Sequence, residues 1–436
     1  MRFFRIVCPI ILLFTAGQAT LNAANHSETI PLDRPLTLKE CINIALQNHS
    51  SVLTAEKDVE ASKAGLKQAK AGYLPDITLG TDYSKSGYEG GQVGTGLRRV
   101  GTFTNNQTTL SITQTFFDGG RTRTAVRQAL AQEQIAKAEM EMAKQERVLA
   151  VTQAYFTALL TKRLADIANQ SVKEAEQQRE MIQARIEAGD AARVDLYPVE
   201  VQVANAKLSK LQADNNARIA ANILRNVMGL GKGPELQLAE VEAPDFNIPP
   251  LEECLARALK DRPEVARSNA QIDSAKAALS LAKQQLLPVP SANLNYDRGL
   301  AGSGYDSQWS IGARLSLNVF DGGAARAAVE TYKARVESLK LAYEQLNKDI
   351  TTEVEEAHLN LTNALERLAA SKANVELART NLEVAREKYN QGLAIPLEIV
   401  SAQISYADAL ASNAQALYDC YIAHAQLEKA MGKRSY

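Results

Sequence analysis

Four segments of the chain alternate apolar and polar residues with a period of two, the pattern of a β-strand with one apolar face. The clearest spans 307–320, where every second residue is apolar: Trp309, Ile311, Ala313, Leu315, Leu317 and Val319. A second clear segment spans 106–117, and weaker versions occupy 75–84 and 290–298. The chain therefore contains two pairs of predicted strands.

The second strand of each pair ends at the same tripeptide. Its two copies are Asp118, Gly119 and Gly120 after the first pair and Asp321, Gly322 and Gly323 after the second. Apolar residues then recur at helical spacing for about 69 residues, over 119–187 and 322–390. Each tripeptide is therefore predicted to be a strand-to-helix junction.

Shorter helical patterns flank these parts. Pro75 and Pro288 close a helix before each strand pair, because proline lacks an amide hydrogen and clashes with the preceding turn. Gly189 and Gly392 break the two long helices, as glycine commonly does at a helix C-terminus. The predicted flanking helices are 37–72 and 191–228 in the first half and 250–286 and 394–431 in the second.

The two halves are an internal repeat. "EAGDAARVDL" at 187–196 aligns with "NQGLAIPLEI" at 390–399, and "TLKECINIALQNHSSV" at 37–52 aligns with "PLEECLARALKDRPEV" at 250–265. Each half therefore has the order helix, strand, strand, long helix and return helix. The predicted division of the chain is a segment 1–23, a first repeat 24–230, a linker 231–249 and a second repeat 250–436.

Two explanations fit the four strands. One is a small soluble sheet packed on a helix; the other is a membrane-spanning barrel with an apolar outer face and a polar lumen. Polar faces of Ser, Thr and Asn suit a wet lumen, and Tyr83, Phe116, Tyr296 and Trp309 lie towards strand ends, where aromatic girdles occur. Four strands cannot close a barrel, for which about eight is the lower limit. A barrel would require several chains.

The two predicted long helices are unusually long. About 69 residues correspond to roughly 100 Å, which exceeds the need of one globular core. Their Ala-rich composition permits the narrow seams of a coiled coil. A soluble adaptor or a filament protein would show the same helices, but not strands inserted between helices in both repeats.

The N-terminus has the features of an export signal. Arg2 and Arg5 precede the apolar run "IVCPIILLFTAG", and small residues follow near Ala19 and Ala23. The run of about 12 residues is shorter than the ~20 that a transmembrane helix needs. We expect 1–23 to be a cleaved signal peptide and the mature chain to lie outside the cytoplasm.

Composition excludes several functions. The 49 basic and 50 acidic residues are interspersed, so no basic surface is available for nucleic acid. Four scattered His and four Cys residues match no metal motif, and we expect no cofactor. "GGQVGTG" at 90–96 lacks the Lys-Ser/Thr ending of a phosphate loop. Cys41 and Cys254 occupy equivalent helix starts and are expected to be small buried side chains, with a disulfide as the lesser alternative.

The double repeat, the "FFDGG" and "VFDGG" junctions and the acidic residue six positions after each tip glycine resemble the outer-membrane efflux proteins, or TolC-like channels. The resemblance covers about 37–432. It implies a mainly α fold with a small β part: a long coiled-coil α-helical barrel continued by a transmembrane β-barrel. Four strands from each chain of a homotrimer would make a twelve-stranded barrel, with Asp-Gly-Gly at each barrel-to-tunnel seam.

The resemblance also implies a function. Such a channel lies in the outer membrane of a Gram-negative bacterium, contacts its lipid, extends into the periplasm, and docks to a periplasmic adaptor and an inner-membrane pump. It is a passive conduit for tripartite efflux or type I secretion and not an enzyme. The alternative is a soluble periplasmic coiled-coil adaptor or structural spacer without a barrel.

The resemblance also assigns roles to residues at the tips of the helices. Gly189, Gly392 and Leu393 match the adaptor-docking tips, although Asp190 stands where the first tip would have leucine. The tunnel-entrance positions are Asp195, Glu398 and Tyr389. Asp195 and Glu398 also fit a simpler explanation, acids at helix N-termini favoured by the helix dipole.

Two entrance positions depart from the family. The expected basic partner of the entrance is Ala394 here, and a second acidic position is Ser401. Any contact that holds the tunnel mouth closed must therefore involve other pairs of residues, for which Arg185 and Arg193 are candidates.

Overall fold

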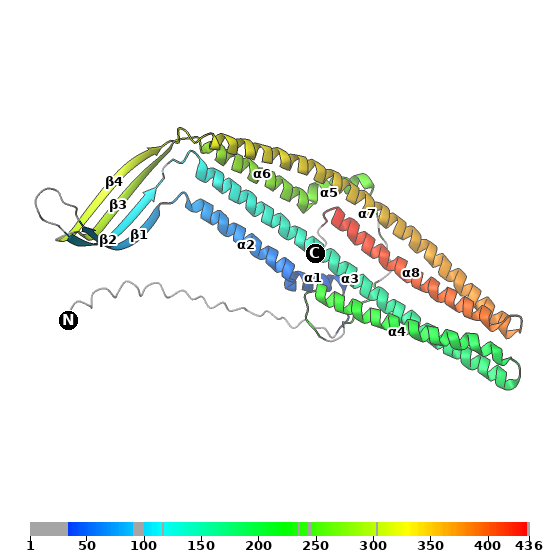
Figure 1. The fold of residues 1–436 in the computed structure, drawn as a ribbon. Helices are drawn as coiled ribbons and strands as arrows, with labels where there is room; N and C mark the ends of the chain where they lie inside the picture. Colours follow the sequence, from blue (N-terminus) through cyan, green and yellow to red (C-terminus); the bar gives the residue numbers. More distant parts are fainter. Residues whose placement is uncertain are drawn as a thin grey trace, which may run out of the picture.

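The computed structural model describes residues 34–89, 100–115, 117–233, 236–241, 246, 248–301 and 304–433. The predicted signal peptide, Phe116 and the 90–96 segment lie outside the described residues. The described chain is elongated, with a β-sheet at one end and two helical hairpins at the other (Figure 1).

Both halves show the same order of elements. The first half consists of α1 (Leu38–Asn48), α2 (Ser50–Ala71), β1 (Asp76–Glu89), β2 (Val100–Gln114), α3 (Arg121–Ala188), the short 3-10 helix η2 (Arg193–Asp195) and α4 (Leu196–Val227). The second consists of α5 (Leu251–Asp261), α6 (Pro263–Gln284), β3 (Val289–Ala301), β4 (Gly304–Ser316), α7 (Ala324–Asn390) and α8 (Pro396–Ala430). The two long helices, α3 and α7, have 68 and 67 residues, close to the predicted length.

The prediction of a single helix before each strand pair was wrong. The backbone is extended at His49 and at Arg262, which divides each predicted helix in two. Gly229 and Gly432, just beyond the ends of α4 and α8, lie against these breaks. A Cβ on Gly229 would lie 3.0 Å from the backbone of His49, and one on Gly432 would lie 2.9 Å from the backbone of Arg262.

The sheet is antiparallel with the order β1-β2-β3-β4. Its register places side chains of similar polarity next to one another across all four strands. One apolar row consists of Ile77, Ile112, Leu294 and Ile311, and the next consists of Leu79, Leu110, Tyr296 and Trp309. Alternation along each strand places hydroxyl and amide side chains on the opposite face.

The helices form one curved layer (Figure 1). Beside the sheet the order is α2-α3-α6-α7, and towards the tips it is α4-α3-α8-α7. Helices α4 and α7 therefore lie at opposite edges of the layer near the tips. Within the described ranges, no helix combines the length and apolar character needed to cross a membrane.

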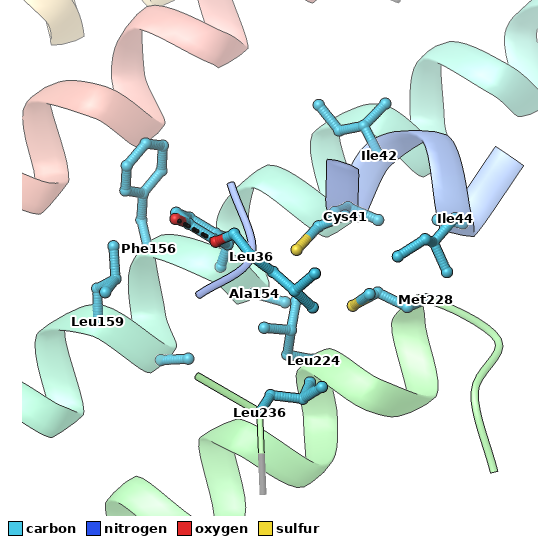
Figure 2. Packing of buried hydrophobic residues seen from close by; sticks show 14 of the residues in the cluster. Leu36, Cys41, Ile42, Ile44, Ala154, Phe156, Leu159, Leu224, Met228 and Leu236 are labelled. Atoms are coloured by element: carbon cyan, nitrogen blue, oxygen red, sulfur yellow. Dashed lines mark hydrogen bonds between the residues drawn. The ribbon is translucent and has the colours of Figure 1, made fainter. Parts of the chain in front are cut away.

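The main cores lie near the middle of the molecule, where α1 packs on α3 and α5 packs on α7. Equivalent positions of the two repeats fill them: Cys41, Val151, Leu224 and Met228 in one, and Cys254, Val354, Leu427 and Met431 in the other. Figure 2 shows the first of these cores.

The cysteines behave as the small buried side chains expected from the sequence. Cys41, Cys254 and Cys420 are buried and unpaired. Burial raises the pKa of the Cys41 thiol to about 12, so this thiol stays protonated at neutral pH.

Candidate functional site

The two Asp-Gly-Gly junctions have the same hydrogen-bonding arrangement. The Asp118 carboxylate accepts hydrogen bonds from the backbone amides of Gly120 and Thr122. The Asp321 carboxylate accepts from the amides of Gly323 at 2.9 Å and Ala325 at 2.9 Å. Each aspartate therefore satisfies amides in the first turn of a long helix that no intrahelical carbonyl can reach.

Both glycines of each junction are required by the backbone. The φ angles are 68° and 84° at Gly119 and Gly120, and 69° and 91° at Gly322 and Gly323. Two consecutive residues in the left-handed region are costly for any residue with a Cβ. The long helices begin directly after the paired glycines, as the sequence predicted, but the strands end before the tripeptides, at Gln114 and Ser316.

The surroundings of the two junctions differ. Arg121 donates a hydrogen bond to the Gln284 carbonyl at 3.1 Å, and the Gln284 side chain donates to the Thr124 hydroxyl at 2.9 Å. The start of α3 is thereby bound to the end of α6. A Cβ on Gly322 or Gly323 would meet no atom within 4 Å, so the start of α7 is open.

The two helical tips are also built alike. Gly189 and Gly392 have φ angles of 84° and 74°. The amide of the residue after each glycine donates back to the helix, from Asp190 to the Arg185 carbonyl and from Leu393 to the Lys388 carbonyl, both at 2.8 Å. These are the αL helix ends that the two glycines predicted.

Apolar side chains are exposed at both tips. Leu393 is 74% exposed although it follows a tightly turned helix end. The other large apolar side chains exposed beside it and on the first tip are Val194, Tyr197, Ile395 and Leu397. An exposed apolar cluster at the end of a molecule is typical of a contact surface.

Tyr389, which the resemblance places at the tunnel entrance, is a buried side chain. It is buried in a cluster that includes Ile182 of α3, Val199 of α4 and Ile399 of α8. The Arg185 guanidinium lies over its ring, 4.6 Å from the centroid, and donates a hydrogen bond to its carbonyl oxygen at 3.4 Å. Arg185, one of the two candidates from the sequence, therefore joins the first hairpin to the second.

A second link between the hairpins was not predicted from the sequence. Arg386 of α7 donates to the Glu174 carboxylate of α3 at 3.1 Å. The sequence around these two residues does not indicate an ion pair, because charged residues are frequent along both helices. Only the packing of α3 beside the second hairpin brings these two together.

Asp195 and Glu398 both lie at the start of a return helix, but their local contacts differ. The Asp195 carboxylate accepts a hydrogen bond from the Ala192 amide at 3.3 Å, in the short turn before α4. Glu398 is exposed in the first turn of α8. Among the described residues, neither carboxylate forms a hydrogen bond or ion pair with the other or with Tyr389. Among the described residues, no group of three or more His, Cys, Asp or Glu side chains is arranged to hold a metal ion.

The polar face of the sheet carries cross-strand hydrogen bonds. Thr109 donates to the Asp297 carboxylate at 2.6 Å, and Ser111 donates to the Asn295 side chain at 2.7 Å. The Asn295 amide in turn donates to Ser310 at 3.5 Å. This face is hydrophilic over three neighbouring strands.

Comparison with known proteins gives one consistent result. The family model described as outer membrane efflux protein matches residues 41–230 and 254–433. Nodulation protein T of Rhizobium leguminosarum bv. trifolii is 24% identical over 409 residues, which is 91% of this chain and 85% of that protein. Outer membrane protein TolC of Escherichia coli K12 is 23% identical, over 86% of this chain and 78% of that protein.

Solved structures show the same fold. The Campylobacter jejuni CmeC outer membrane channel matches with a TM-score of 0.80 and 16% identity, covering 92% of this chain and 87% of that one. The fold class expected from the sequence, a long helical part continued by a small sheet, is confirmed. The chain belongs to the outer membrane efflux protein family and is therefore an outer-membrane export channel, rather than an enzyme or a soluble periplasmic spacer.

Proposed function

We propose that three copies of this chain form the exit duct of a tripartite efflux or type I secretion system. The observation that carries this proposal is the sheet with two unpaired edges. Strands β1 and β4 have 14 and 13 residues, and each pairs on only one side within the chain. Long unpaired edges template further pairing, and joining β4 of one copy to β1 of the next closes twelve strands.

The helical layer has matching edges. Helix α4 exposes Leu208 and Leu211, and α7 exposes Leu341, Leu359 and Leu377, each at least 65% exposed. These leucines lie on α4 and α7, the two helices at the edges of the layer. In a closed ring of three copies they would be buried against a neighbour.

The internal repeat supports the same ring. Within one chain, the start of α3 is bound to the end of α6 through Arg121 and Gln284. The equivalent start of α7 at Gly322 and Gly323 is open. In a ring of three copies, the end of α2 of the neighbouring copy would pack beside the start of α7. It would take the position that α6 has beside α3 within one chain. Each chain-to-chain boundary would then repeat the boundary between the two repeats.

We further propose that the tips bind a periplasmic adaptor, which connects the duct to an inner-membrane pump. Gly189, Gly392 and Leu393 would form the docking surface, because the αL turns present exposed apolar side chains at the end of the molecule. The relatives' names include an alkaline protease secretion protein and a cobalt-zinc-cadmium resistance protein. Pump and adaptor, rather than the hydroxyl and amide lining of this chain, would select the cargo.

The tunnel mouth would be held closed by contacts between hairpins. Besides the apolar cluster around Tyr389, the contacts of Arg185 with Tyr389 and of Arg386 with Glu174 join α3 to α7. Asp195 and Glu398 would line the mouth and favour cations. Separation of the two hairpins would widen it.

The test is to determine the mass of the detergent-purified protein and its single-channel conductance in a planar bilayer. We expect a particle of three chains and small, discrete conductance steps. A water-soluble monomer or dimer without conductance would contradict the shared barrel.

A further inference from the structure

A polar row interrupts the apolar face of the sheet, and beyond it on the same face lie Tyr83, which is 70% exposed, and Asn106. The row of Leu79, Leu110, Tyr296 and Trp309 is followed on the same face by Thr81, Thr108, Arg298 and Ser307. The Thr81 and Thr108 hydroxyls lie 3.3 Å apart, which confirms that they share a face. A fully polar row therefore borders an aromatic and aliphatic row across all four strands.

The distance to the other end of the apolar face matches a membrane. Nine residue steps separate Ser307, in the polar row, from Ser316 at the end of β4. They span about 30 Å along the strand at ~3.3 Å per residue, which a tilt of about 40° reduces to about 23 Å of height. Val319 and Phe320, both 87% exposed, mark the end beside the helices. The outer limit of the hydrocarbon therefore lies near the Arg298 row, between the aromatic side chains of the Trp309 row and Tyr83.

Arg298 is a cation at this limit without a carboxylate to neutralise it. The neighbouring Asp297 points to the opposite face, where it accepts the hydrogen bond from Thr109. No ion pair of Arg298 is found in the part of the chain that the structure describes. Ser307 lies directly opposite Arg298 and adds a hydroxyl donor to the same row.

We propose that Arg298, with Ser307, binds the phosphate groups of a phosphorylated lipid in the outer leaflet of the membrane. The inference rests on the proposed function, because it requires the apolar face to contact lipid. A guanidinium suits this site, since its planar donors bind two phosphate oxygens at once. Tyr296 and Trp309 would lie at the edge of the hydrocarbon, where aromatic side chains gather. In a ring of three copies the site would occur three times around the barrel.

The first measurement locates Trp309, the only tryptophan of the chain. The protein is reconstituted in phosphatidylcholine vesicles that carry bromine at different depths of the acyl chain, and quenching of Trp309 fluorescence is recorded. We expect the strongest quenching from the shallowest bromines. Absence of quenching at every depth would contradict the lipid-facing barrel itself, and the phosphate site with it.

The second measurement tests the site alone. Wild type, Arg298→Gln and the control Arg314→Gln are reconstituted with and without diphosphoryl lipid A, and thermal unfolding is followed by circular dichroism. Arg314 is a matched control because it is an exposed arginine on the adjacent strand whose side chain lies on the polar face. We expect lipid A to raise the unfolding midpoint of wild type and Arg314→Gln equally, and Arg298→Gln to lose at least half of that rise.

Three outcomes would overturn the phosphate site while leaving the channel intact. The rise could be the same in Arg298→Gln as in wild type, it could be absent from all three proteins, or inorganic phosphate without lipid A could reproduce it. Arg298→Lys keeps the charge but loses the planar fork, so we expect it to retain only part of the rise.

Discussion

Arg185 and Tyr389, 204 residues apart in the sequence, connect the two helical hairpins at their tips. Arg185 extends from α3 across the Tyr389 ring of α7 and bonds to the backbone of the same residue. Tyr389 is 5% exposed and is packed among side chains from all four tip helices. Arg185 of the first repeat therefore contacts a buried residue of the second repeat.

We predict that Arg185→Ala opens the tunnel mouth. The cation-π contact and the charged hydrogen bond together are worth about 1 to 2 kcal/mol, so the ratio of closed to open channels should fall about five- to thirtyfold. Single-channel recording measures this ratio. Tyr389→Phe is the control, because it keeps the ring and the carbonyl and should behave as wild type. Closed times in Arg185→Ala equal to those of wild type would exclude this contact from closure.

The Glu174–Arg386 pair should contribute less. Its partners are 22% and 46% exposed, and solvent-exposed pairs typically contribute about 0.2 to 1 kcal/mol. We expect a double-mutant cycle of Glu174→Gln and Arg386→Gln to give a coupling energy near this range at low salt. Because salt screens exposed charges, the coupling should vanish at high ionic strength, and a coupling unchanged by salt would contradict a surface pair.

Replacing Leu393 by Ser should weaken adaptor binding without lowering the yield of trimer. The Leu393 side chain is exposed, so its removal costs the channel itself little while removing apolar area from the contact. Binding of the purified adaptor to immobilised channel measures the effect, which we expect to be about tenfold. The matched control is Asp190→Ser at the equivalent place on the first tip, where no apolar side chain is lost. Equal adaptor affinity for wild type and Leu393→Ser would remove this residue from the docking surface.

Cation selectivity should depend on Asp195 and Glu398. We expect Asp195→Ala and Glu398→Ala each to lower the ratio of potassium to chloride permeability, and the double variant to lower it most. Reversal potentials in a salt gradient give this ratio. Glu252→Ala serves as control, because Glu252 is also an exposed acid in a first helical turn, but lies on α5 near the middle of the molecule. Unchanged selectivity in the double variant would place both acids outside the entrance and favour their simpler role at helix N-termini.

His49 should make the first repeat sensitive to acid. Its Nδ1 accepts a hydrogen bond from the Ser51 amide at 3.2 Å and caps α2. Burial, followed by the charge of Arg147, lowers the pKa of His49 below its ordinary value. As the pH falls below that ordinary value, about 6.5, the unfolded chain binds a proton before the folded one, so stability is lost on acidification.

The measurement is the unfolding midpoint at pH 7.5 and pH 5 in wild type and in His49→Asn. Asparagine caps a helix but does not titrate in this range. We expect the midpoint of wild type to fall further than that of the variant. His424, whose pKa burial also lowers, contributes equally to both proteins. An equal fall in both would show that His49 binds a proton in the folded state as readily as in the unfolded chain.

The sequence by itself determined which segments become strands and which become helices. Period-two alternation, the Asp-Gly-Gly tripeptides and the tip glycines are local signals, because each acts through the backbone conformation of a few neighbouring residues. The two long helices accordingly begin just after Asp-Gly-Gly and end just before Gly189 and Gly392. The repeat was also visible, since it is a comparison of the sequence with itself.

Tertiary structure decided the helix break at His49 and the contacts between hairpins. At His49 the helical pattern continues, and the break is accompanied by the close approach of Gly229 from another helix; only Pro263, which disfavours helix at Arg262, signals one break locally. Arg185 and Arg386 resemble the other basic residues of their helices until packing brings Tyr389 and Glu174 within reach. Interactions between residues about 200 positions apart depend on how the repeats pack, and no local pattern encodes that arrangement.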